Sequence, residues 1–341
     1  MRISKRLIYA MAALALLPCL MAAESHKPMM KAVVVHEYGG PEVLKFEDVP
    51  RPEPKENEVL VRVIGAGVNP ADPLIVSGKY AKEFGTHLPL IPGYDIAGVV
   101  EKTGGKITRF KVGDPVFAYV LWGGGWAEYA VATEGEAAAK PPSLSFVAAA
   151  AVPLAALTAW QALIDAAKLS AGQTVLIHGG SGGVGTMAIQ IAKGRGAKVI
   201  ATASTRNQDL LKQLGADVSI DYTATKFEEV AKDVDVVLDS VGGETLARSY
   251  SVVKKGGFIA TLVSRLDQAE LDKHGIRGAS TAVKPNADQL GEIAKLIAER
   301  KLKPIVTRML PLAGAAEAFK QAATHHTRGK QVIKVADEPR G

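Results

Sequence analysis

The chain has 341 residues, of which 48% are hydrophobic and 22% are charged. This balance is typical of a folded globular protein, and the length is enough for two domains. The 41 Lys and Arg residues exceed the 35 Asp and Glu residues by six, and no dense basic stretch points to nucleic acid. The single cysteine, Cys19, excludes a disulfide framework, an iron–sulfur cluster and a cysteine-ligated structural zinc.

The first 23 residues have the order of a secretory signal peptide. Three basic residues precede an apolar stretch at 7–17, and the small pair Ala22-Ala23 follows as a cleavage site. The apolar stretch is too short to span a membrane comfortably. We therefore expect residues 1–23 to be removed, and the mature protein to be periplasmic or secreted without stable membrane insertion.

A second start site is also consistent with the sequence. Met29 and Met30 open the stretch MKAVVVHEYGG, which is a typical beginning for a protein that stays inside the cell. If translation starts there, the protein is cytoplasmic and the N-terminal segment is not part of it.

Residues 31–135 contain short runs with strand character, separated by Gly-Gly, Pro-rich and Gly-Asp turns. The runs are KAVVV, VLVRVIGAGV, DIAGVVEKTG, PVFAYV and WAEYAVA. This half of the chain predicts a small, barrel-like β domain. The apolar segment 146–160 has only fifteen residues and contains Pro153, so it predicts a buried helix rather than a membrane span.

From 153 to about 283, apolar strand runs alternate with helical patterns. The strand runs cover residues 174–178, 197–202, 234–240 and 257–263. They are continuously apolar, which is typical of strands buried on both faces of a parallel sheet. The C-terminal part adds helices near 288–300 and 313–323 and a last strand, QVIKV. The fold class is α/β.

A glycine-rich loop follows the first of these strands, in the segment HGGSGGVG at 178–185. Gly180, Gly182 and Gly185 satisfy the pattern GxGxxG, with a strand before it and a helix after it. Glycines let backbone N–H groups approach a pyrophosphate, and the helix N-terminus adds partial positive charge. The loop predicts a dinucleotide site, although a glycine-rich loop can also serve only to turn the chain.

The residues after the second strand favour NADPH over NADH. A site for NAD usually has an acid there, whereas this chain has Ala203-Ser204-Thr205-Arg206. Ser204 and Arg206 can donate hydrogen bonds to the 2′-phosphate of NADPH. The alternative is a solvent-exposed helix start that Ser204 or Thr205 caps.

Several motifs in order along residues 30–335 are similar to those of a known family. They are GAGVNPADPLIVSGKY (65–80), LIPGYDIAGVV (90–100), FKVGDPVF (110–117), GGGWAEYAV (123–131), PLAALTAWQAL (153–163), HGGSGGVG (178–185), LGADVSIDY (214–222) and DVVLDSVGG (235–243). The chain resembles the medium-chain dehydrogenase/reductase superfamily, in its zinc-free NADPH:quinone oxidoreductase branch.

This resemblance implies a GroES-like β-barrel catalytic domain plus a Rossmann domain, which is a doubly wound parallel sheet. The expected boundaries are 30–152 for the catalytic domain, 153–285 for the NADP-binding domain and 286–341 for a segment that completes the catalytic domain. It also implies a homodimer joined through edge strands around 257–263. The apolar run Phe258–Val263 would be an aggregation hazard if it were an open edge.

Zinc-using relatives have Cys in the pattern G-V-C-x-x-D and His-Glu after the later Pro-Gly. This chain has Asn69 and Tyr94 at those positions, and neither is a good zinc ligand. The seven histidines show no ligand spacing, so we expect no metal site. Without a Lewis acid, reduction of a quinone or an activated enone is easier than oxidation of a plain alcohol.

The resemblance also assigns site residues. Asn69, Asp72 and Tyr80 match positions at the nicotinamide and substrate end of the cleft, where Tyr80 either donates a proton or forms an aromatic wall. Tyr222 matches a tyrosine near the adenosine phosphate, and Lys330 matches the basic residue of the closing R-G-K segment unless it is a solvated surface lysine. The expected cofactor site comprises Gly180, Ser181, Gly182, Gly183, Val184, Gly185, Ser204, Arg206, Tyr222 and Lys330.

Two other functions compete with this one. Tyr250 and Lys254 fit the Y-x-x-x-K pair of short-chain dehydrogenases, but about 170 residues precede the glycine loop, so we treat this match as chance. The second is a structural or sensor protein that binds NADPH on the same scaffold without catalysis. Nothing in the sequence excludes it.

Overall fold

A computed structural model describes residues 28–324 and 326–339 of the chain, without the side chains of residues 83 and 84. The predicted signal peptide at 1–23 lies outside the described residues. Within the described part, no helix has the length and apolar character needed to cross a membrane.

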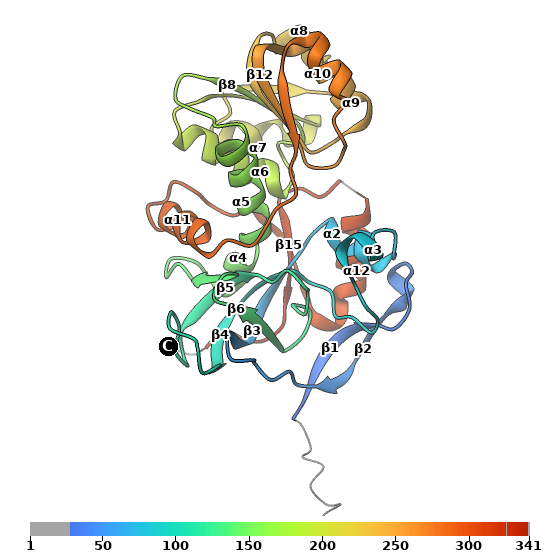
Figure 1. Ribbon diagram of the computed structural model, residues 1–341, viewed down its shortest axis with the longest axis vertical. Coiled ribbons are helices and arrows are strands. Elements are labelled where there is room, and N and C mark those ends of the chain that lie inside the picture. Colours follow the sequence, from blue (N-terminus) through green and yellow to red (C-terminus); the bar gives the residue numbers. More distant parts are fainter. Residues whose placement is uncertain (1–27, 325, 340–341) are drawn as a thin grey trace, which may run out of the picture.

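The upper lobe in Figure 1 is built on a six-stranded, all-parallel sheet with helices packed against it. Its order is β10-β9-β8-β11-β12-β13. The strands are β8 (Thr174–Ile177), β9 (Lys198–Ala203), β10 (Val218–Asp221), β11 (Val234–Asp239), β12 (Val253–Thr261) and β13 (Arg277–Ser280). The strand order reverses between β8 and β11, and dinucleotides bind at such a switch point in open α/β sheets.

Burial explains why these segments form strands. Every residue of β11 is buried, and β8 and β9 each expose little beyond their first residue. Helices that cover a parallel sheet on both faces leave no solvent-exposed side for polar residues. Continuous apolar runs therefore form the central strands, as the sequence predicts.

One expectation about this sheet is wrong. The run at 257–263 does not form an open edge, because β12 pairs with β11 on one side and with β13 on the other. The edge strand on this side of the sheet is β13, with the sequence RGAS, in which Arg277 and Ser280 are exposed. The apolar side chains Phe258 and Ile259 are consequently interior to the sheet.

The lower lobe contains a seven-strand sheet whose main path is β14-β15-β3-β4-β5-β7, with β6 paired to β3. The strands are β3 (Glu58–Val68), β4 (Asp95–Thr103), β5 (Pro115–Tyr119), β6 (Tyr129–Thr133), β7 (Ala137–Ala139), β14 (Val306–Pro311) and β15 (Lys330–Lys334). A hairpin of β1 (Met29–Val35) and β2 (Leu44–Pro50) packs beside it. Because β15 pairs antiparallel with β3, both ends of the described chain build this lobe.

Helices connect the two lobes and cover their sheets. Those of the lower lobe are α2 (Ala71–Val76), α3 (Ala81–Phe84), α4 (Phe146–Ala150) and α12 (Ala315–Ala323). The junction is formed by α5 (Pro153–Trp160) and α11 (Ala287–Ala298), and α5 continues as a π-helical turn. The upper lobe has α6 (Gly183–Gly194), α7 (Gln208–Gln213), α8 (Phe227–Val230), α9 (Gly243–Ser249) and α10 (Gln268–His274).

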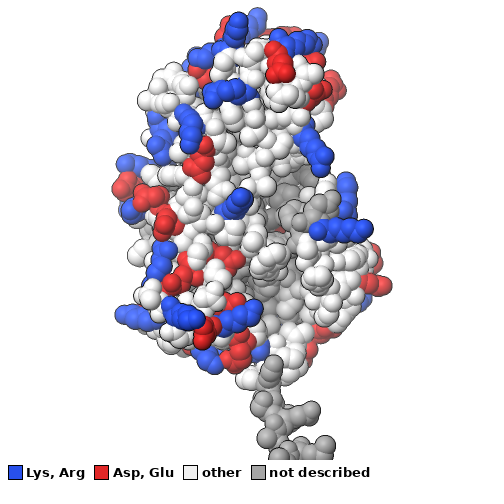
Figure 2. All heavy atoms as spheres, in the orientation of Figure 1, with Lys and Arg blue, Asp and Glu red and all other residues white. Residues whose placement is uncertain are grey.

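Charged side chains are mixed in sign over the face seen in Figure 2. Lys and Arg alternate with Asp and Glu around its margin, and uncharged residues cover most of its middle. This face therefore has no broad basic surface of the kind that binds nucleic acid.

Candidate functional site

The glycine-rich loop lies between the end of β8 and the start of α6, where Gly180 and Gly185 have a steric reason. A Cβ on Gly180 would lie 2.9 Å from Leu211 Cδ2, and a Cβ on Gly185 would collide with the backbone of the loop itself. Gly182, by contrast, has open space beside it apart from one carbonyl oxygen at 3.4 Å. The backbone is thus exposed at the N-terminus of a twelve-residue helix, which suits a phosphate group.

The C-terminal segment contacts this loop directly. Gly329 forms a parallel bridge with Gly182, and its N–H donates to the carbonyl oxygen of Ser181 at 2.8 Å. The aliphatic part of Lys330 then lies against Gly183, where a Cβ would come within 2.8 Å of the lysine Cδ. The structure therefore places Lys330 beside the start of α6, and its contact with a cofactor stays a prediction.

Lys330 is not a solvated surface lysine, because its side chain is only 4% exposed. Its ammonium group donates to Asp95 Oδ2 at 2.9 Å and to the amide oxygen of Asn69. Asn69 in turn donates from Nδ2 to the same Asp95 oxygen at 2.9 Å. These three buried residues, called here the Asn69–Asp95–Lys330 triad, link β3, β4 and β15 at the foot of the loop.

Asp95 was not among the predicted site residues. Its second oxygen, Oδ1, accepts from the backbone N–H of Leu154 at 2.6 Å, near the start of α5. The sequence signal was its position in the segment PGYD, where zinc-using relatives have Pro-Gly-His-Glu. Its partner Lys330 is 235 positions away, so spacing along the chain could not reveal the ion pair.

Asp72 holds the backbone of the site. It is fully buried, and its two oxygens accept from the backbone N–H groups of Asn69 at 2.7 Å and Gly93 at 3.0 Å. Burial raises the pKa of Asp72 to about 7, against the opposing effects of these two donors and of Lys330. Because both oxygens are engaged, Asp72 fixes the turn that presents Asn69.

Tyr80 caps the start of α3 and is half-buried. The ammonium group of Lys79 lies 5.4 Å from its ring centroid, a distance typical of a cation–π contact. Tyr80 is not among the side chains that line the cavity described below. Its part in the reaction stays a prediction.

The residues predicted for the adenosine phosphate lie around the end of β9. Ser204 is half-buried and begins a 3-10 turn, whereas Arg206 and Tyr222 are exposed. Asn207 was not predicted. It is 5% exposed, and its Nδ2 donates to the hydroxyl oxygens of Ser181 at 3.1 Å and Ser204 at 3.2 Å.

These contacts of Asn207 orient two serine hydroxyls. Each oxygen accepts a hydrogen bond from the amide, so each hydroxyl proton is free to donate elsewhere. Asn207 Oδ1 is buried and has no hydrogen-bond partner among the described residues. Two free donors beside a glycine loop, together with a buried acceptor, fit the phosphate and hydroxyl groups of a phosphorylated ribose.

An acid does lie near this position, at the end of β10 rather than β9. Asp221 is aligned with Ala203 in the parallel pairing of the two strands. Hydrogen bonds from the hydroxyls of Thr205 and Thr223 lower the pKa of Asp221, so it is ionised at neutral pH. The hydroxyl groups of Thr205 and Thr223 thus engage the carboxylate, and sequence spacing did not indicate it.

A cavity of about 320 Å³ opens in the lower lobe. Its wall consists mainly of apolar groups, and the lining residues are Ile75, Gly85, Thr86, His87, Leu90, Tyr94, Leu121 and Trp122. Trp122 is 75% exposed, so a large aromatic ring lies at its rim. A mostly apolar cavity with a few polar groups is the usual form of a small-molecule site.

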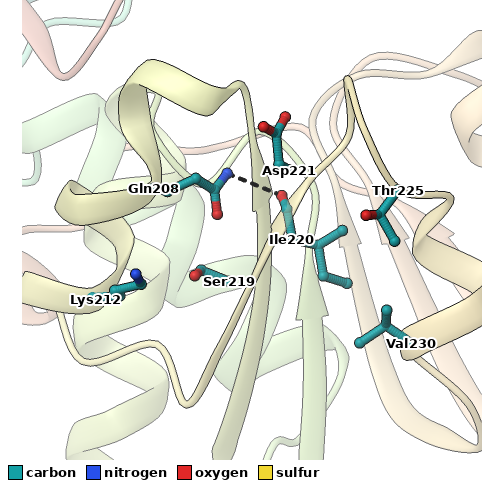
Figure 3. A pocket seen from close by; sticks show the side chains of 7 residues that line it. All are labelled: Gln208, Lys212, Ser219, Ile220, Asp221, Thr225 and Val230. Carbon is teal, nitrogen blue, oxygen red and sulfur yellow. Dashed lines mark hydrogen bonds between the residues drawn. The ribbon is translucent and has the colours of Figure 1, made fainter.

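A second cavity, of about 290 Å³, lies at the outer edge of β10 (Figure 3). Gln208 lies on one side of it and donates to the carbonyl oxygen of Ile220, while Thr225 and Val230 lie on the other. It has no residue in common with the glycine loop or with the Asn69–Asp95–Lys330 triad. We therefore treat it as separate from the candidate site.

The positions of zinc ligands in related proteins are occupied here by Asn69 and Tyr94. Within the ranges that the structure describes, no group of three or more His, Cys, Asp or Glu side chains is placed to hold a metal ion. Asn69 is instead engaged by Lys330 and Asp95.

Comparison with known families matches two regions of the chain. Residues 55–142 match the alcohol dehydrogenase GroES-like domain, and residues 214–333 match the family described as zinc-binding dehydrogenase. The first region covers most of the lower sheet. The second includes the last strands of the upper sheet and continues through β15.

Individual relatives span nearly the whole chain. An NADPH-dependent alkenal/one oxidoreductase of Arabidopsis thaliana chloroplasts is 38% identical over 89% of this chain and 79% of its own length. The quinone oxidoreductase from Coxiella burnetii has a TM-score of 0.84 and 36% identity, covering 90% of this chain and all of its own. The quinone oxidoreductase of Escherichia coli, solved with NADPH, has a TM-score of 0.82 and 28% identity over 89% of this chain and all of its own.

Proposed function

Because this chain belongs to the medium-chain dehydrogenase/reductase superfamily, among the quinone and alkenal/one oxidoreductases, we propose that it is an NADPH-dependent oxidoreductase. It transfers a hydride to a quinone or to an activated enone or carbonyl compound, without zinc. The observation that carries this proposal is the contact between the glycine loop and the C-terminal segment, which brings Lys330 and Asn69 to the foot of a dinucleotide loop.

The residues present fit NADPH. The open backbone at Gly182 and the N-terminus of α6 suit the pyrophosphate, and the hydroxyls that Asn207 orients suit the 2′-phosphate. When bound, the nicotinamide supplies a hydride. The chain's own part is to hold that ring against the Asn69–Asp95–Lys330 triad, whose contacts are already formed in the protein alone.

The triad also determines the charge of the site. The positive charge of Lys330 is balanced by Asp95 at 2.9 Å, so the ion pair adds little net charge to the cleft. A site without strong net charge accepts an uncharged acceptor such as a quinone or an enone. Such acceptors are already electrophilic and need only a hydrogen-bond donor for the oxyanion that forms.

The experiment that tests this function is an NADPH oxidation assay with purified protein. We expect turnover with 1,4-naphthoquinone and with oct-1-en-3-one, and we expect the rate to be unchanged by EDTA. Tight binding of NADPH without turnover of either acceptor would support the structural or sensor protein instead. Loss of activity on chelation, with recovery on adding zinc, would contradict the zinc-free assignment.

Two further proposals concern the oligomeric state of the protein and its signal peptide. We propose a homodimer joined through β13, since that strand and not β12 is the edge of the parallel sheet.

We also propose that residues 1–23 are a signal peptide, on the charge and apolar pattern of the sequence. The intact mass of protein from fractionated cells tests the latter, and a cytosolic species beginning at Met29 or Met30 would exclude export.

A further inference from the structure

The 320 Å³ cavity contains a polar group that no assigned role uses. Tyr94 lines it and is 6% exposed. Its hydroxyl makes no hydrogen bond to any residue that the structure describes, yet the oxygen is not fully buried. Buried tyrosine hydroxyls usually have a partner. Tyr250 illustrates the rule, because its hydroxyl accepts from the backbone N–H of Asp267.

The backbone holds Tyr94 firmly. Its carbonyl oxygen accepts from the N–H of Val120 at 2.8 Å, which ties it to the strand end after β5. Gly123 lies beside the ring, because a Cβ there would be in van der Waals contact with Tyr94 Cε1 at 3.6 Å. Gly123 has a φ of 81°, so a side chain there would strain the backbone. The segments at Val120 and Gly123 therefore both lie against Tyr94.

Tyr94 is also connected to the triad by short contacts. Gly93, the preceding residue, donates its N–H to Asp72 at 3.0 Å, and Asp72 accepts from the N–H of Asn69 at 2.7 Å. Tyr94 therefore lines an apolar cavity whose wall is joined, through the Asp72 carboxylate, to Asn69 of the triad. With NADPH bound as proposed, a ligand in this cavity would lie on the Asn69 side of the cleft.

We propose that the Tyr94 hydroxyl donates a hydrogen bond to the carbonyl oxygen of the acceptor, while the apolar wall of the cavity holds the acceptor's hydrocarbon substituent. This inference rests on the proposed function and deepens it. It assigns Tyr94 as a catalytic residue, and it names the preferred acceptors as uncharged enones or quinones with an apolar side chain.

An enone is reduced at its β-carbon. The β-carbon accepts a hydride from the reduced cofactor, which is oxidised to NADP⁺, and the π electrons of the double bond move toward the carbonyl oxygen. The resulting enolate oxygen accepts the hydrogen bond from Tyr94, and water then supplies the proton that completes the saturated ketone. Two electrons and one hydrogen come from the cofactor, and one proton comes from solvent.

Tyr94 donates a hydrogen bond in this step without releasing its proton. Burial strongly raises the pKa of Tyr94, and the nearby Asp72 and Tyr119 raise it further. A phenolate in that environment is unfavourable, so the hydroxyl remains protonated throughout the neutral range. A neutral donor in a mostly apolar cavity is an effective stabiliser of a developing oxyanion.

The test compares Tyr94→Phe with wild type, using oct-1-en-3-one as the acceptor. Removing one oxyanion donor typically lowers kcat about 10²- to 10³-fold, and we expect a loss of that order with an unchanged KM for NADPH. Tyr119→Phe is the matched control, because Tyr119 is equally buried and adjacent but does not line the cavity. Its activity should remain within a few-fold of wild type.

A second measurement does not depend on turnover. The site-specific replacement of Tyr94 by 3-fluorotyrosine keeps the size and the hydroxyl, and octan-3-one with NADP⁺ forms a complex that cannot react by hydride gain. We expect the ¹⁹F resonance to shift on adding octan-3-one but not on adding octane.

The outcomes separate the two proposals. If wild type reduces neither acceptor, the proposed function fails. If wild type is active and Tyr94→Phe matches it, the inference about Tyr94 is overturned. If Tyr94→Phe fails to fold, as shown by lost NADPH affinity, the ¹⁹F result decides, and equal shifts with the ketone and the alkane overturn the inference.

Discussion

Lys330 brings a full positive charge to a place where only 4% of its side chain is exposed. Such a charge is tolerable because Asp95 lies at 2.9 Å and the amide oxygen of Asn69 accepts a further hydrogen bond. A buried pair of this kind contributes little net stability compared with an apolar pair, but removing one partner leaves the other charge uncompensated. The triad is therefore sensitive to any single substitution.

We expect Lys330→Met to lower the free energy of unfolding by about 3–5 kcal/mol, because Asp95 remains buried without its partner. Urea unfolding at pH 7.5 measures this loss. The double variant Lys330→Met with Asp95→Asn should recover part of it, since the charge left behind is removed. A loss below about 1 kcal/mol for the single variant would mean that solvent reaches Asp95 more freely than its contacts indicate.

We expect individual side chains around Ser204 to decide the preference for NADPH. Arg206→Ala should raise the KM for NADPH about ten- to a hundredfold and leave NADH nearly unchanged, since a charge-assisted contact contributes roughly 1.5–3 kcal/mol. Ser204→Asp should invert the preference, because it adds repulsion and removes a donor that Asn207 orients. Steady-state kinetics with both cofactors and one quinone measures the effect. Equal weakening of both cofactors by Arg206→Ala would make Arg206 a solvated surface residue.

At the scale of elements, the residue that follows β8 is a buried histidine. His178 Nε2 donates to the hydroxyl oxygen of Ser249 at 3.0 Å, since that hydroxyl already donates its only proton to Thr245. Nδ1 then accepts from Thr202 at 3.2 Å. Burial lowers the pKa of His178 from 6.5 to about 4, so the imidazole is neutral in the folded protein.

This shift predicts a pH dependence of stability. Below pH 6.5 the unfolded chain binds a proton at this histidine that the folded chain does not, so stability falls as the pH drops from about 6.5 to 4. At pH 5.5 we expect this group to cost about 1.4 kcal/mol relative to pH 7.5.

Comparison with His178→Asn isolates this effect, because the variant lacks the titrating group. Asp72 acts in the opposite direction, since its raised pKa gives stability that is lost as the pH rises from about 4 to 7. Urea unfolding of both proteins at pH 7.5 and pH 5.5 cancels that contribution. A stability difference that does not change between the two pH values would show that His178 titrates normally.

Elements differ in how far the sequence predicts them. The central strands β8, β9 and β11 follow from continuous apolar runs, because a strand buried on both faces has no polar positions. The edge strand β13 has only four residues, RGAS, and an exposed arginine, so no apolar pattern indicates it. This is why β12 was wrongly expected to be the edge.

The candidate site likewise has parts that the sequence predicts and parts that it does not. The glycine loop is predictable because its spacing is local, and its neighbours are strand and helix in sequence order. The contact of Lys330 with Asn69 joins residues 261 positions apart, and only the resemblance to a family placed Lys330 there. Tyr94 appeared in the sequence as an unsuitable zinc ligand, and its unpartnered hydroxyl is visible only once the cavity is formed.

At the scale of the whole molecule, β13 offers an open edge for a second copy. The N–H of Thr281 donates to Thr261, so the alternation of a parallel strand turns the N–H of Ser280 outward. We expect light scattering at micromolar concentration to give twice the monomer mass. Ser280→Pro removes that outward donor without touching the pairing to β12, and it should shift the protein toward monomer. A wild-type protein that is monomeric at this concentration would contradict the dimer.

The closing of the lower sheet by β15 has a consequence for protein synthesis. The six strands of the upper sheet all leave the ribosome before Lys330 does, whereas the lower sheet lacks two strands until residues 306–334 emerge. The left-handed turn at Gly329, with a φ of 56°, leads into the final strand beside the glycine loop. A nascent or truncated chain that ends before this turn contains every strand of the upper sheet but lacks Lys330, so it has no triad. We therefore expect such a chain to be unable to transfer a hydride, even though its glycine loop is present.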